Sequence, residues 1–127
     1  MDYNTVVSRG TRFVNTTPHQ LNLMWADGEE FVVPVSDILV NAKVLESDAG
    51  THPSGAALVR TSFEHSEADS AKLDEIEAAH PASVILGSII AAQAFPGRVL
   101  AFVPAPGFER VPPSEKKMQA DKFTTFA

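Results

Sequence analysis

The segment from Phe13 to Val44 limits the possible folds of this chain more than any other part. Polar and apolar residues alternate from Gln20 to Trp25, which is typical of a strand with one face in water. Asp27-Gly28 follows and predicts a tight hairpin, because glycine adopts a positive φ without steric cost. The β-branched run from Glu29 to Val35 is then the returning strand, so this segment predicts antiparallel sheet.

The rest of the chain continues in short segments of the same kind. Four further strands are predicted, at residues Ile38 to Leu45, Ala56 to Phe63, Val84 to Leu86 and Arg98 to Val103. Turn-forming residues fill Asp48 to Gly55, which predicts a loop. Helices are predicted over residues 66–79 and 89–95, with Ser66 and Ser88 as N-caps.

The fold class predicted from these segments is α+β. It contains six to eight short strands, mainly antiparallel, and one or two short helices, and a small barrel is one arrangement of such strands. The length of 127 residues favours one domain. We expect a single β-rich globular domain over residues 1–107, followed by a proline-rich strap and aromatic tail over residues 108–127.

Composition argues against several classes of function. The chain has no cysteine, which removes disulfides, cysteine nucleophiles and thiolate metal sites. Its net charge is −6 and its basic residues are scattered, so we expect no nucleic-acid partner. The longest apolar run, Ser83 to Phe95, is shorter than the roughly 20 residues that span a bilayer. We therefore expect no membrane partner and a cytoplasmic location.

Metal and cofactor motifs are also missing from the sequence. The histidines lack the spacing of a zinc site, and the chain has neither a Walker A loop nor a G-x-G-x-x-G motif. We expect no metal and no cofactor. His52-Pro53-Ser54-Gly55 is not a G-x-S-x-G elbow and predicts a loop turn instead.

Thr17-Pro18-His19 is the sharpest local motif. His19 is a candidate ligand-binding residue, as a hydrogen-bond donor or a base, because its reference pKa lies near neutrality. The alternative is a purely structural turn, in which Pro18 fixes φ and the Thr17 hydroxyl bonds to backbone groups. A weaker reading is a small hydrolase that pairs His19 with a carboxylate such as Asp37.

Isolated basic residues on or beside predicted strands suggest an anion site. Lys43, Arg60 and Arg98 are the candidates that would join His19, with Arg110 as a further member of the set. If they converge, the guanidinium groups offer bidentate contacts to a phosphate. The alternative is that these charges are dispersed and solvated.

Phe108, Phe123 and Phe126 form the aromatic part of the predicted tail. Each needs an apolar surface, because burying such a ring contributes about 1.5–3 kcal/mol. We expect them to bind a partner chain or a neighbouring subunit. The alternative is that they pack on their own domain.

Short motifs also connect the chain to a family. They are Asn15-Thr16-Thr17-Pro18-His19, Asp27-Gly28, the degraded Pro34-Val35-Ser36-Asp37, Ala42-Lys43-Val44, and Ala92 to Arg98. The chain resembles an uncharacterised family of small bacterial and phage proteins with the pattern N-L-T-P-H, D-G, P-P-S-G and A-R-V. Lys43 replaces the arginine of that pattern, and the resemblance stops before Glu109. It implies an arrangement of strands and no particular chemistry.

Two functions are predicted from these observations. The first is a non-catalytic phage-type accessory protein that binds a small anionic ligand, with nucleotides among the candidates, through His19, Lys43, Arg60 and Arg98. The alternative is a virion or particle assembly protein whose C-terminal strap docks on neighbouring subunits. The first would act in the host cytoplasm and the second in the particle.

Overall fold

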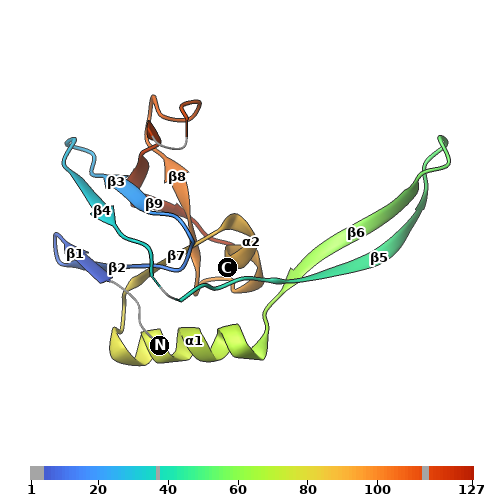
Figure 1. Cartoon of the computed structure of the whole chain (residues 1–127), viewed down its shortest axis with the longest axis horizontal. Helices are drawn as coiled ribbons and strands as arrows, with labels where there is room; N and C mark the ends of the chain where they lie inside the picture. Colours follow the sequence, from blue (N-terminus) through green and yellow to red (C-terminus); the bar gives the residue numbers. More distant parts are fainter. Residues whose placement is uncertain (1–4, 37, 113–114) are drawn as a thin grey trace.

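The computed structural model describes residues 5–36, 38–112 and 115–127 and confirms the α+β fold (Figure 1). Within these residues the chain forms nine strands and two helices. They are β1 (Thr5–Ser8), β2 (Thr11–Asn15), β3 (Leu21–Met24), β4 (Glu30–Val33), β5 (Lys43–Thr51), β6 (Ala57–Glu64), α1 (Glu67–Ala79), β7 (Val84–Gly87), α2 (Ile89–Ala94), β8 (Leu100–Pro104) and β9 (Met118–Thr124).

Seven of the strands form one sheet in the order β1-β2-β7-β8-β9-β3-β4. The pairs β1–β2, β8–β9 and β3–β4 are antiparallel, whereas β2–β7, β7–β8 and β3–β9 are parallel. The outer strands β1 and β4 lie next to each other, so the sheet is a nearly closed barrel. The antiparallel pair β5–β6 forms a separate sheet.

Side-chain contacts connect the two ends of the barrel sheet, where the described residues of β1 and β4 form no ladder. The Arg9 guanidinium lies 2.6 Å from the Asp27 carboxylate and 4.8 Å from the centre of the Trp25 ring. The Trp25 indole N–H donates to the Ser8 hydroxyl at 2.8 Å. Hydrogen bonds from the Glu29 backbone N–H and from Arg9 lower the pKa of Asp27, so this carboxylate stays ionised to a more acidic pH than an ordinary aspartate.

Alternate residues of the central strands face two separate cores. Phe13 of β2 and Leu86 of β7 belong to the aromatic-rich cluster on one face of the sheet, which also contains Leu23. Their neighbours Val14 and Ile85 pack on the other face, in the cluster that includes residues of α1 and α2. The period of two along a strand explains why both faces of β2 and β7 are apolar.

Both helices begin where the sequence predicts. The Ser66 hydroxyl accepts a hydrogen bond from the Asp69 backbone N–H at 3.1 Å and caps α1. The Ser88 hydroxyl accepts from the Ala91 backbone N–H at 3.1 Å and caps α2. Only Leu73 and Ile76 of α1 are fully buried, so this helix covers the barrel with a narrow apolar stripe.

The C-terminal residues complete the barrel. β9 lies between β8 and β3, with Phe123 opposite Phe102 of β8 and Leu23 of β3 opposite Met118. The part of the predicted strap and tail from Met118 to Thr124 is therefore a strand inside the sheet. Pairing between distant segments decides this position, and the local sequence carries no sign of it.

β5 and β6 form a long hairpin that reaches away from the barrel (Figure 1). Residues 48–51, predicted as loop, belong to β5, and residues 38–42, predicted as strand, are extended chain without ladder pairing. Every residue of β6 except Phe63 is exposed. We call residues 43–64 the β arm.

Gly87 lies where β7 reaches α2, and the space beside it is filled. A Cβ at this position would lie 2.6 Å from Val99 Cγ1 and 3.3 Å from the Thr16 hydroxyl oxygen. We expect Gly87→Ala to lower the free energy of unfolding by about 1–3 kcal/mol, as overpacking does. Urea denaturation measures this change.

The matched control is Val99→Ala, which removes the Val99 Cγ1 atom that a Cβ at position 87 would meet. Val99→Ala alone creates a cavity, but in the Gly87→Ala background it relieves the contact, so the double variant should lose less stability than the two single losses added together. Additive losses would contradict this explanation of Gly87.

Candidate functional site

The turn after β2 is held by a buried asparagine. The Asn15 side chain is fully buried; its Nδ2 donates to the His19 carbonyl at 2.7 Å, and its Oδ1 accepts from the Thr17 backbone N–H at 2.9 Å. The Thr17 hydroxyl accepts the His19 backbone N–H at 3.3 Å. Thr17 and Asn15 thus satisfy the backbone of the turn, as the structural interpretation of this motif predicts.

Thr16 ties the same turn to the neighbouring strand β7. Its backbone N–H and its hydroxyl both donate to the Leu86 carbonyl, at 3.0 and 2.8 Å. The Thr16 carbonyl in turn accepts the Val40 backbone N–H at 3.2 Å. These bonds fix the turn beside Ser88, at the start of α2.

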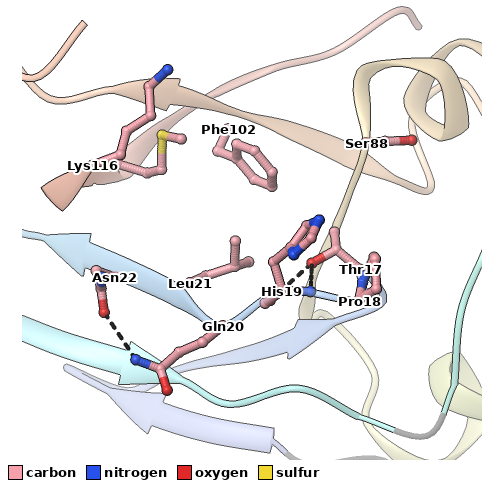
Figure 2. A pocket seen from close by; sticks show the side chains of 10 residues that line it. Thr17, Pro18, His19, Gln20, Leu21, Asn22, Ser88, Phe102 and Lys116 are labelled. Carbon is pink, nitrogen blue, oxygen red and sulfur yellow. Dashed lines mark hydrogen bonds between the residues drawn. The ribbon is translucent and has the colours of Figure 1, made fainter. Parts of the chain in front are cut away.

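A pocket of about 330 Å³ lies against this turn (Figure 2). Its apolar wall comes from three different strands, as Leu21 of β3, Phe102 of β8 and Met118 of β9. The remaining lining residues are Thr17, Pro18, His19, Gln20, Asn22, Ser88 and Lys116. Figure 2 shows the His19 ring between Thr17 and Phe102.

Lys116 is the one formally charged residue among the described residues that line the pocket. His19 and Lys116 are its ionisable lining residues, and no acidic side chain lines it within the described part of the chain. Neither the His19 ring nor the Lys116 ammonium has a hydrogen bond or ion pair with another described residue. Figure 2 shows the two side chains at opposite sides of the pocket, with the Lys116 ammonium directed away from His19.

The structure separates the four residues predicted to bind a ligand. Only His19 lines the pocket. Lys43 and Arg60 lie on the β arm, on β5 and β6. Arg98 lies 2.6 Å from the Asp74 carboxylate and 2.7 Å from that of Glu77, both on α1.

Arg98 is held by these acidic neighbours. Burial lowers its pKa, but hydrogen bonds to Glu77 and Asp74 more than compensate, so the pKa is raised. Its guanidinium ties the segment before β8 to α1. The residue therefore has a structural explanation that needs no ligand.

The three phenylalanines predicted to bind a partner have different surroundings. Phe123 packs within the chain, with its ring centre 6.4 Å from that of Phe13. The Lys117 ammonium lies 5.3 Å from the Phe108 ring centre. Phe126 is 39% exposed, and Phe108 is half-buried.

Sequence reasoning missed the pocket residues that lie outside the turn. Lys116 and Met118 reach the pocket because β9 pairs with β3, and Phe102 reaches it from the other neighbour of β9. No local signal places these residues together. The sequence predicts Ser88 only as a helix cap.

Other chemical possibilities find little support in the described residues. Within them, no group of three histidine, aspartate or glutamate side chains is arranged to hold a metal ion. Neither helix in the described ranges is long and apolar enough to cross a membrane. Asp37, the partner of His19 in the hydrolase interpretation, lies outside the described residues.

Comparison of the chain with protein-family models, curated proteins and solved structures finds no match. The resemblance to the phage-type family remains a prediction from short motifs.

Asn15 should be essential for the shape of the pocket wall. We expect Asn15→Ala to lower the free energy of unfolding by about 1–3 kcal/mol, because it leaves buried backbone groups unpaired. Urea denaturation measures the loss, and the amide resonances of residues 17–21 should shift.

Asn22→Ala is the matched control, since the Asn22 side chain only accepts a 3.4 Å bond from Gln20 at the surface. It should change stability by no more than about 0.5 kcal/mol. Equal losses for the two variants would contradict the role given to Asn15.

Proposed function

We propose that this protein is a non-catalytic binding protein for a small anionic ligand with an apolar body. The observation that carries the proposal is the pocket itself, whose ionisable groups are His19 and Lys116 and whose wall is Leu21, Phe102 and Met118. This keeps His19 from the predicted set and replaces Lys43, Arg60 and Arg98 by Lys116.

The charge of the pocket lining favours an anionic ligand. The chain as a whole has a net charge of −6, yet the described lining of this pocket contains no carboxylate. A local cationic group without a counter-ion attracts an anion and orients it, especially where apolar walls limit screening. A neutral His19 still donates or accepts one hydrogen bond.

The volume of the pocket and its apolar wall restrict the uncharged part of the ligand. A volume of about 330 Å³ lies near the lower end of the range for small-molecule sites, which favours a compact ligand. The Phe102 ring and the Met118 thioether offer contacts to a flat apolar group. An aryl phosphate, or the base and phosphate of a mononucleotide, has both required parts.

Binding fits the site better than catalysis. Among the described residues, no carboxylate is bonded to the His19 ring to orient it as a base. The Ser88 hydroxyl accepts the Ala91 backbone N–H as a helix cap. No nucleophile and base are paired in this lining, which supports a recognition role.

Phenyl phosphate, AMP and inorganic phosphate test the proposal on the full chain. We expect phenyl phosphate to bind more tightly than inorganic phosphate, because only the former uses the apolar wall, and the amide resonances of residues 17–22 to shift on titration. Lys116→Met keeps the aliphatic stem and removes the charge, so it should weaken binding at least about tenfold.

Lys43→Met is the matched control, because Lys43 carries the same charge but lies on the β arm. It should leave the affinity unchanged. The proposal is wrong if none of the three probes binds at millimolar concentration, or if Lys43→Met and Lys116→Met weaken binding equally.

One observation favours the second candidate, a virion or particle assembly protein. The β arm exposes Val44, Leu58 and Val59 and has no other sheet beside it within the described residues. The docking element would then be this arm and not the C-terminal segment. The first candidate would act in the cytoplasm of the host cell, and the second in the particle.

A further inference from the structure

The β arm makes too few contacts to be stable as a free two-stranded ribbon. Its residues are almost all exposed, and its base alone packs on the barrel, through Phe63. An isolated hairpin of two strands is marginally stable in water, and a third or fourth strand stabilises it. A partner that adds strands would therefore stabilise the arm.

The outer edge of β6 is the better template of the two free edges. β5 has a register shift between Asp48 and Thr51 and contains Gly50. Bulges of this kind protect an edge strand from pairing. β6 has the sequence ALVRTSFE, with no proline, no glycine and three residues of high β propensity, Val59, Thr61 and Phe63.

We infer that two copies of this chain pair through β6 in antiparallel orientation, so that their arms form one four-stranded sheet. The inference is independent of the ligand pocket and deepens the second candidate function by naming the partner as a second copy. Backbone hydrogen bonds between the two β6 strands would supply the affinity, as in other cases of strand addition.

Charge determines the register of this pairing. Arg60 and Glu64 lie four residues apart on one strand, so their side chains project from the same face. With Ser62 on the two-fold axis, Arg60 lies directly opposite Glu64 of the second copy, and this pair occurs twice. With Arg60 on the axis, the two guanidinium groups would face each other and repel.

Pairing with Ser62 on the two-fold axis also buries exposed apolar side chains of the arm. Leu58 and Val59 lie toward the tip of the arm, and antiparallel pairing places them at the base of the other arm. α2 lies beside β6 at that base, and its first residues, Ile89 and Ile90, are 56% and 40% exposed. Figure 1 shows α2 next to the point where the arm leaves the barrel.

Charge reversal on the full chain tests the partner and the register together. Sedimentation velocity should show a concentration-dependent dimer for the unmodified chain. Arg60→Glu and Glu64→Arg each place like charges opposite each other twice in a homodimer, and each should weaken dimerisation at least tenfold. An equimolar mixture of the two variants pairs opposite charges again and should restore the dimer.

Glu46→Arg is the matched control, since it makes the same charge change on β5 of the same arm. It should leave the dimer unchanged. A monomeric unmodified chain would overturn the inference, and so would a dimer that the β6 variants do not weaken or that their mixture does not restore. Titration of the same samples with phenyl phosphate measures ligand binding separately. A chain that does not bind the ligand is therefore distinguished from a chain that does not dimerise.

Discussion

The buried side chain of Asn15 is the constraint on which the site depends. Its amide bonds to the backbone of the turn after β2 and reaches the Val33 and Pro34 carbonyls at 3.4 and 3.3 Å, where the chain leaves β4. One side chain thus connects the end of β2, the start of β3 and the end of β4. The position of His19 follows from these bonds, because its backbone N–H and carbonyl are both held within the turn.

The order of the barrel strands then determines the other half of the pocket. β9 is the last strand in the sequence, yet it lies between β8 and β3. Closing the long loop between β3 and β9 is entropically unfavourable and must be offset by burial, which Ala120, Phe123 and Met118 supply. The pocket exists only when β9 has paired with its neighbours, because Lys116 and Met118 are part of its lining.

The sequence predicted what is encoded locally. The caps Ser66 and Ser88 and the Asp27-Gly28 hairpin depend on neighbouring residues, and they occur as predicted. Lys116 gives no such signal, because its place in the same pocket lining as His19 results from strand pairing across almost the whole chain. The separation of the predicted basic residues has the same origin, since strand periodicity says nothing about which strands are neighbours.

The structure divides the basic residues of this acidic protein by whether an acidic partner lies beside them. Arg9 and Arg98 are paired within the body, where they join the ends of the barrel sheet and tie the segment before β8 to α1. Lys116 and Arg60 have no acidic partner among the described residues, and they lie at the pocket and on the β arm. The chain has 16 acidic residues and a net charge of −6, so a cation without an acidic partner keeps its full attraction for an anion from outside. Under the two proposals, Lys116 would meet a ligand anion at the pocket, and Arg60 would meet a glutamate of a second copy at the β arm.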